Sequence, residues 1–552
     1  MTRQGRILVV DDQKEWCEQV VEKLQDAGFY VEAVHNKNNA LKRLDETFFH
    51  LFILDIRLNE SDPSNEDGIQ LLQELETRGL GEATKVIMLS NYGTKDRVRM
   101  ALVKHRNKVA DFLFKEDQLT DQMVLEKDQF SNQILLESVQ AVFSEHVKFN
   151  PALDIHWQQV QGPEQAVLGL EVGGTRFKKG TALQSQFAAE LDDLLCRLFY
   201  KAGNLIVQPL TPGHSGAGIL AVQPFYSTGG TARTVIVKYG SVLKIEEEYN
   251  NFKQYVESFV GGARNTTAHG VRRTQHLSGI IYSFIGANND RLEDFDSAYR
   301  HSDISRIKRI IDRFFLDTCS PWYANLSQTF LNVTKDYQDL LGFTWDALER
   351  TISRQLKSVQ FVQGKQKLTF TSLAGRTFTN PLQVATRPPF RCSTYTCITH
   401  GDCNQYNLFV DNSEHVWLID FQGTGQGHVL RDIAMLDSTI RFQLLVSEED
   451  ATLNERLAME ETLCSIKQFS QVDQLLDAFP TKNQTLAKAY AAVVYLRTLA
   501  HELVRLNPND DISEYYIALL YNALNAISFS SLSSLQREHA LLCASVLIDQ
   551  LE

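Results

Sequence analysis

The sequence predicts two fold classes in series, an α/β doubly wound parallel sheet at the N-terminus and an α+β region after it. The first prediction rests on four short apolar runs that alternate with amphipathic helical patterns. The second rests on several β-branched runs that are followed by long helical patterns toward the C-terminus. The chain has 552 residues, which is enough for two or three domains with a core each.

Each of the four N-terminal apolar runs ends in a polar or charged side chain. Runs 6–10, 51–54, 85–89 and 110–114 end in Asp11 and Asp12, Asp55, Ser90 and Lys115, respectively. Helical patterns lie between them, for example over 15–27 and 38–47. The carboxyl ends of parallel strands share one edge of such a sheet, so these groups are expected to lie together. Carboxylates grouped in this way are typical Mg²⁺ ligands.

This order of strand-end groups resembles that of response-regulator receiver domains, over residues 1–145. By that resemblance Asp55 accepts a phosphoryl group from a sensor histidine kinase, and Asp11 and Asp12 hold Mg²⁺ together with it. The resemblance further implies a phosphoryl contact, an ion pair and an aromatic switch for Ser90, Lys115 and Phe112, respectively.

Two departures from that family concern how the domain would switch. The loop over 56–67 is longer and more acidic than usual, and Glu116 follows Lys115 where the family usually has proline. Both leave the phosphorylation chemistry in place. For Asp55 taken alone, a helix N-cap would be an equally good interpretation.

A second motif lies at residues 400–407, His-Gly-Asp-Cys-Asn-Gln-Tyr-Asn, and Leu-Ile-Asp-Phe follows at 418–421. Phosphoryl transfer from ATP needs a carboxylate that orients the attacking hydroxyl, and an amide and a second carboxylate that hold Mg²⁺. Asp402, Asn407 and Asp420 are these three group types in that order. Predicted strands flank them. Aspartate and asparagine in a glycine-containing loop are otherwise common turn formers.

A glycine-rich turn over 211–218 precedes this motif and lies between two predicted strands. Such a turn lets the backbone approach phosphates. The next predicted strand, 234–238, ends in Lys238, a candidate cation for those phosphates. A helical pattern over 244–256 then offers Glu248 as the partner of this lysine, although a solvated first helical turn would also explain the glutamates there.

Together these elements resemble the aminoglycoside phosphotransferase and protein-kinase-like superfamily over roughly residues 200–540. The resemblance implies a bilobal kinase-like fold, with a connector at 146–200, an N-lobe at 201–290 and a helical C-lobe at 291–552. It implies catalytic roles for Asp402 and His400, and Mg²⁺ ligation by Asn407 and Asp420. The residues implied in ATP binding are Gly213, Ser215, Gly216, Gly218, Lys238 and Glu248.

The same resemblance gives Asp432 a structural place under the loop at 400–407. Two departures are the short gap between Lys238 and the glutamates, and Gln422-Gly423 where protein kinases have D-F-G. The second departure favours the small-molecule branch of the superfamily. Neither removes a group that the chemistry requires.

Composition excludes several function classes. The net charge of −13 gives no electrostatic case for nucleic acid or for an anionic membrane. No apolar run reaches the roughly 18–20 residues of a membrane span, and the polar N-terminus does not resemble a secretory signal. We therefore expect a cytoplasmic protein with reduced cysteines. A zinc site is the alternative for one cluster, but the cluster lacks C-x-x-C pairs; its members are Cys392, Cys397, His400 and Cys403.

The predicted function is a two-component response regulator whose output is an ATP- and Mg²⁺-dependent phosphotransferase, gated by phosphorylation of Asp55. The phosphate acceptor, a small molecule or a protein, is left open, and the receiver could support a homodimer. One alternative is a signalling adaptor with a non-catalytic, nucleotide-binding kinase fold. Another is a receiver whose C-terminal helices sequester a partner protein.

Overall fold

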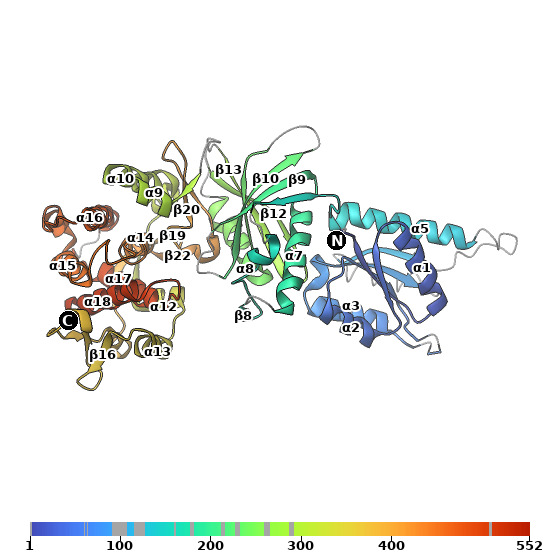
Figure 1. The fold of residues 1–552 in the computed structure, drawn as a ribbon, viewed down its shortest axis with the longest axis horizontal. Helices are drawn as coiled ribbons and strands as arrows, with labels where there is room; N and C mark the ends of the chain where they lie inside the picture. Colours follow the sequence, from blue (N-terminus) through green and yellow to red (C-terminus); the bar gives the residue numbers. More distant parts are fainter. Residues whose placement is uncertain are drawn as a thin grey trace. The chain divides into compact units, whose positions relative to one another are not determined.

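In the computed structural model, residues 3–551 are described apart from 60, 63, 91–107, 115–126, 159–161, 177–180, 211–215, 227–231, 259–264, 286–291 and 507–509. The chain forms two compact units (Figure 1). Unit 1 comprises Met1–Glu246 with His269–Ser283, and unit 2 comprises Glu247–Ala268 with Phe284–Glu552.

Five parallel strands form the first sheet of unit 1, in the order β2-β1-β3-β4-β5. They are β1 (Arg6–Val10), β2 (Tyr30–Val34), β3 (Leu51–Asp55), β4 (Lys85–Ser90) and β5 (Val109–Phe114). Their alternate side chains enter two cores, which is why the strands read as continuous apolar runs. Helices α1 (Lys14–Asp26) and α5 (Lys127–Val142) pack into one core, and α2 (Lys37–Glu46) and α3 (Asp67–Thr77) into the other. Strand β2 was not predicted, because Glu32 interrupts its apolar run.

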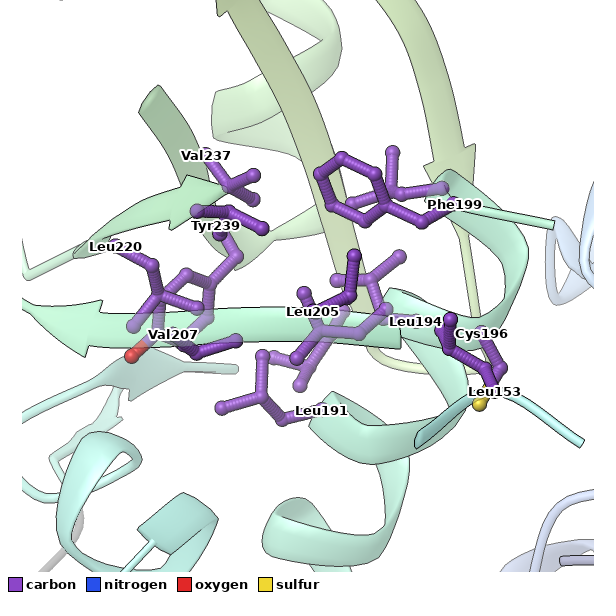
Figure 2. Close-up of a cluster of buried hydrophobic side chains, with 14 of the residues drawn as sticks. Leu153, Leu191, Leu194, Cys196, Phe199, Leu205, Val207, Leu220, Val237 and Tyr239 are labelled. Atoms are coloured by element: carbon purple, nitrogen blue, oxygen red, sulfur yellow. The ribbon is translucent and has the colours of Figure 1, made fainter. Parts of the chain in front are cut away.

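A second sheet of unit 1 has the order β12-β13-β11-β10-β9-β6. Its strands are β6 (Asp154–Trp157), β9 (Ala202–Pro209), β10 (Gly218–Tyr226), β11 (Val235–Ser241), β12 (Asn265–Arg273) and β13 (Leu277–Ile285). Helix α7 (Ala182–Leu198) packs on it through Leu191 and Leu194, which meet Leu205, Val207 and Leu220 of the sheet (Figure 2). This apolar core includes the segment expected to be a connector.

The segment expected to be a connector also contains helix α6 (Gly162–Ala166) and the short hairpin of β7 (Glu171–Val172) and β8 (Thr175–Arg176). Helix α8 (Val242–Asn251) follows β11 and continues as a π-helical turn, Phe252–Val256. The helical pattern predicted over 244–256 is therefore present with an irregular end.

Unit 2 contains three small three-stranded sheets and most of the helices. Its strands are β14 (Glu293–Asp294), β15 (Ser327–Asn332), β16 (Val359–Val362), β17 (Lys367–Phe370), β18 (Phe378–Thr379), β19 (Arg391–Thr399), β20 (Leu408–Val410), β21 (Val416–Leu418) and β22 (Gly425–His428). The sheets are β14-β20-β21, β15-β19-β22 and β16-β17-β18. Strand β15 lies within 291–552, which was expected to be a helical C-lobe; its pairing with β19 decides its conformation.

The helices of unit 2 build its core. They are α9 (Phe295–His301), α10 (Ile304–Asp312), α11 (Ser320–Tyr323), α12 (Val333–Leu341), α13 (Trp345–Gln355), α14 (Arg431–Phe442), α15 (Leu453–Leu463), α16 (Gln484–Val504), α17 (Ser513–Ile527) and α18 (Ser534–Gln550). Helices α14, α17 and α18 are buried on nearly all sides, as expected of core helices. Within the described ranges, every helix is too short or too polar to cross a membrane.

Candidate functional site

The acidic strand ends of the first sheet lie together, as their order along the chain predicts. Strands β1 and β3 are parallel neighbours, with Val10 opposite Leu54, so the residues that follow them meet at one edge. One carboxylate oxygen from each of Asp11, Asp12 and Asp55 lies within 4.8 Å of the other two. Asp11 and Asp55 are almost fully buried. Three carboxylates at this spacing repel one another, and a divalent cation would relieve that repulsion.

The backbone around Asp55 holds this residue at the strand end despite the long loop that follows. The Ile56 amide donates to Leu89 O at 3.1 Å, and the Gly68 amide donates back to Ile56 O at 3.1 Å. A Cβ atom at Gly68 would lie 1.9 Å from Asp55 O, so only glycine allows helix α3 to begin this close. The acidic loop over 56–67 therefore ends beside the residue at which it begins.

The other residues predicted for the receiver are placed less completely. Ser90 ends β4, and its backbone pairs with Phe114 of β5 at the same edge as Asp55. Phe112 is half-buried and packs against the core formed with α2 and α3. Lys115 lies outside the described residues.

In unit 2, the loop after β19 fixes the carboxylate of Asp402 from both sides. Asn407 donates its Nδ2 to Asp402 Oδ2 at 2.9 Å. Asn404 donates its Nδ2 to Asp402 Oδ1 at 3.0 Å. Asp402 is itself half-buried, so its carboxylate has a fixed orientation and remains accessible. Asn404 lies inside the motif but was not among the residues predicted from it.

A second aspartate, Asp432 in the first turn of α14, fixes the backbone of the same loop. Its two carboxylate oxygens accept the amides of His400 and Gly401 at 2.8 and 2.9 Å. The hydroxyl of Tyr323 donates to it at 2.9 Å. Asp432 is fully buried, and a buried carboxylate needs such donors. No local sequence signal marks Tyr323 as part of this arrangement.

Asp420 lies at the same end of a hairpin as Asn407. Strands β20 and β21 pair Leu408 with Leu418, and beyond this pair the Ile419 amide donates to Asn407 O at 3.1 Å. Asp420 adopts a left-handed conformation, with φ of 68°, which is uncommon for residues other than glycine. Such conformations often occur at functional sites.

The ring of His400 joins the loop to this turn. Its Nε2 donates to Ile419 O at 3.0 Å, because a carbonyl oxygen can only accept, and its Nδ1 accepts the Asp402 amide at 3.4 Å. The ring is fully buried. Thr424 Oγ1 donates to His400 O at 3.0 Å. Both ring nitrogens are engaged by backbone groups, so His400 orients the loop where the resemblance implied a catalytic role.

The residues predicted for ATP lie in unit 1, apart from Glu248, which falls in unit 2. Gly218 begins β10, and Gly216 accepts the Glu171 amide at 3.0 Å. Lys238 on β11 and Glu248 on α8 are each 1% exposed. Gly213 and Ser215 lie outside the described residues.

The zinc alternative finds no support. Over the described ranges, the only group of three or more histidine, cysteine or acidic residues with ligand atoms in reach of one another is Asp11, Asp12 and Asp55. Burial raises the pKa of the Cys403 thiol well above its usual value.

Residues 7–123 match the family described as Response regulator receiver domain. Similar solved structures include chemotaxis protein CheY4 of Vibrio cholerae, with 19% identity over 25% of this chain and 98% of that chain and a TM-score of 0.20. Another is a response regulator from Thermotoga maritima, with 21% identity, 26% and 99% coverage and a TM-score of 0.20. A comparison with curated proteins gave no match.

The larger part of the chain matches a second family. Residues 203–364 and 346–528 match the family described as Ternary complex associated domain 9. The two matches together run from 203 to 528, which is more than half of the 552 residues. The chain therefore belongs to the Ternary complex associated domain 9 family, and it carries a response regulator receiver domain at its N-terminus.

Proposed function

We propose that this chain is a two-component response regulator whose output is an ATP- and Mg²⁺-dependent phosphotransferase. The observation that carries the proposal is the fixed, accessible carboxylate of Asp402, with Asn407 beside it and Asp420 at the same hairpin end. Those are the protein groups that phosphoryl transfer needs.

In the proposed reaction, Asp402 accepts the proton of the acceptor's hydroxyl. The hydroxyl oxygen bonds to the γ-phosphorus of ATP, the bond from that phosphorus to the bridging oxygen breaks, and ADP leaves. The Nδ2 group of Asn407 donates to Asp402, so the side-chain oxygen of Asn407 is not used in that bond. This oxygen and the Asp420 carboxylate are hard ligands suited to Mg²⁺. Bound Mg²⁺ would neutralise charge on the phosphates.

The nucleotide phosphates are assigned to the glycine-rich turn and to Lys238. This assignment rests on the resemblance, on the burial of the Lys238 side chain and on its position in a strand that pairs with β10. Substituting Lys238 by methionine tests it independently, since Lys238→Met should weaken ATP binding.

The receiver is proposed to control this output. Asp55 would take the phosphoryl group of a sensor histidine kinase, with Mg²⁺ held by Asp55, Asp11 and Asp12. Ser90, Phe112 and Lys115 would respond to the new charge and bias the output between inactive and active arrangements.

The test is Mg²⁺-ATP turnover by the purified full chain, with and without beryllofluoride on Asp55. We expect Asp402→Asn to lower turnover by about 10²- to 10⁴-fold, the range of a lost general base. Asp339→Asn is the matched control, since Asp339 is exposed and forms an ion pair with Lys335. Equal turnover in both variants would refute the mechanism. ATP binding without turnover in any variant would instead support the adaptor alternative.

A further inference from the structure

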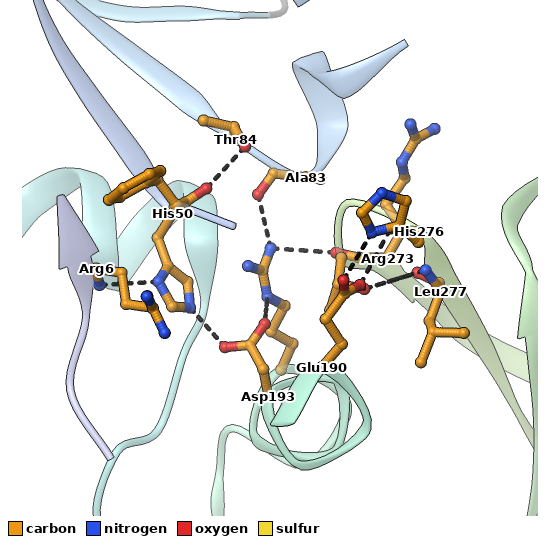
Figure 3. A network of polar contacts seen from close by, with 12 residues as sticks. Arg6, His50, Ala83, Thr84, Glu190, Asp193, Arg273, His276 and Leu277 are labelled. Carbon is orange, nitrogen blue, oxygen red and sulfur yellow. Dashed lines mark hydrogen bonds and ion pairs between the residues drawn. The ribbon is translucent and has the colours of Figure 1, made fainter. Parts of the chain in front are cut away.

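The edge of the receiver sheet opposite the acidic site contacts the second sheet of unit 1. Helices of a doubly wound sheet end at this edge, so carbonyl groups without helical partners collect there. Three of them accept side-chain donors from outside the receiver. Figure 3 shows the contact at Ala83. Gln275 donates to Leu44 O at 2.8 Å, Arg197 donates to Ala83 O at 2.8 Å, and Arg273 donates to Gly79 O.

A buried group of three titratable residues lies at the centre of this edge. His50 immediately precedes β3, and Asp193 and Arg197 are one turn apart on α7. His50 Nε2 lies 2.5 Å from Asp193 Oδ1, and Arg197 Nε donates to Asp193 Oδ2 at 2.8 Å. None of the three is more than 5% exposed.

The hydrogen bonds of His50 determine its protonation state. The backbone amide of Arg6 lies 2.9 Å from His50 Nδ1, and an amide N–H can only donate. Nδ1 is therefore the unprotonated acceptor, and the single ring proton is on Nε2, where it is donated to Asp193. Protonation at Nδ1 would place its N–H group opposite the N–H group of Arg6, and two donors cannot form a hydrogen bond with each other. The closed arrangement thus accepts only neutral His50.

The other groups around His50 favour the same state. Arg6 from β1 and Arg197 from α7 are the cations nearby, Asp193 is the anion, and the rings of Phe48, Phe143 and Phe149 cover the rest. Burial lowers the pKa of His50, and the attraction of Asp193 does not fully reverse this. Burial alone would raise the pKa of Asp193, but Arg197 and His50 bring it below its usual value.

We propose that α7 holds the receiver by this edge through a latch of His50, Asp193 and Arg197, and that the latch closes only on neutral His50. The receiver is then docked by the side opposite Asp55, so phosphorylation need not break the dock, whereas acidification loosens it. This inference is independent of the proposed phosphotransferase activity.

The sign and size of the pH effect follow from linkage. A histidine whose pKa is lower in the docked state than its free value of about 6.5 takes up a proton when the dock opens. Docking is therefore fully stable above about pH 7 and weakens as the pH falls below about 6.5. For a free pKa of about 6.5, the ratio of undocked to docked molecules should rise about tenfold from pH 7.5 to 5.5.

Single-molecule fluorescence transfer in the full chain measures that ratio. Dyes on Glu22→Cys in the receiver and Gln208→Cys in the second sheet would report the docked and undocked populations; both native side chains are exposed. Mild urea is added until the undocked population at pH 7.5 is measurable. His50→Gln keeps a donor for Asp193 and cannot titrate, so its ratio should not change with pH. His146→Gln, at an exposed receiver histidine, should titrate like the wild type.

Two results would overturn the proposal. One is a wild-type ratio that does not change with pH, or that changes equally in His50→Gln. The other is a double variant, Asp193→Ala with Arg197→Ala, that remains docked at pH 7.5 under the same urea. Circular dichroism verifies that each variant is folded, so that loss of docking is not confused with unfolding.

Discussion

One acidic site lies in the receiver and another in unit 2, and their carboxylates have different neighbours. In the receiver the neighbours are other carboxylates, and in unit 2 they are hydrogen-bond donors. In the receiver, Asp11, Asp12 and Asp55 are brought from two strand ends to within 4.8 Å of one another. In unit 2, Asp402 and Asp432 each receive several hydrogen-bond donors from the protein itself. The first arrangement concentrates negative charge that a bound cation would neutralise, and the second uses hydrogen bonds to carboxylates to shape a loop. The role of an aspartate therefore depends on its neighbours more than on the number of carboxylates.

Removing Asp432 should have the largest effect on stability. In Asp432→Ala, two buried backbone amides and the Tyr323 hydroxyl lose their acceptor, which should lower the free energy of unfolding by about 3 kcal/mol or more. Urea denaturation measures this loss. Asp339→Ala removes an exposed aspartate and should cost less than about 0.5 kcal/mol. Equal losses in both variants would contradict a loop-shaping role.

The next effect is expected at Gly401, where the loop meets the turn. Its φ is 79°, and a Cβ atom would lie 2.1 Å from Gly423 O. Gly401→Ala should therefore suffer both left-handed strain and a steric clash, about 2–4 kcal/mol in total. Gly342→Ala measures the cost of the left-handed strain without a steric clash, because Gly342 has a φ of 63° but open space around it. A similar cost at both positions would mean that the clash is relieved by movement.

At the receiver site, removal of a carboxylate should have the opposite sign. Asp11→Asn keeps the oxygen that accepts the Gln13 amide but removes one repelling charge, so the free energy of unfolding without Mg²⁺ should rise by about 1–2 kcal/mol. Stabilisation by added Mg²⁺ should shrink at the same time. Thermal unfolding with and without Mg²⁺ measures both effects. Asp26→Asn, at an exposed site on α1, serves as the control. A destabilised Asp11→Asn would show that the carboxylate has a structural role.

The smallest effect should come from Tyr323. Tyr323→Phe removes one donor to Asp432 and leaves both backbone amides bonded, so the expected loss is about 1 kcal/mol. The same urea titration gives the value. A loss as large as that of Asp432→Ala would mean that the hydroxyl, and not the backbone amides, is the essential partner.

Local patterns predicted much of the fold where strands are short, apolar and buried on both faces. The strands that carry Asp11 and Asp55 were found because each is a continuous apolar run that ends in a carboxylate. Strands β2 and β15 were not, since Glu32 breaks the pattern of the first and the second depends on pairing with β19. A strand that is defined by its partner leaves a weak signal in its own sequence.

The candidate sites divide in the same way. Asp402, Asn407 and Asp420 were identified as candidate site residues from the sequence, because they lie within one loop and one hairpin. The anchoring by Tyr323 and Asp432 brings together residues 109 positions apart. Only the packing of helices α11 and α14 decides that contact.

The sequence by itself determined where the charged groups stand along each strand and loop, because strand periodicity and turn chemistry act over a few residues. Only the tertiary structure decided which groups meet across the chain. His50 and Asp193 are 143 residues apart, and neither belongs to a motif. Their contact arises where the receiver and α7 pack against each other, because a polar or charged group that is buried there requires a partner.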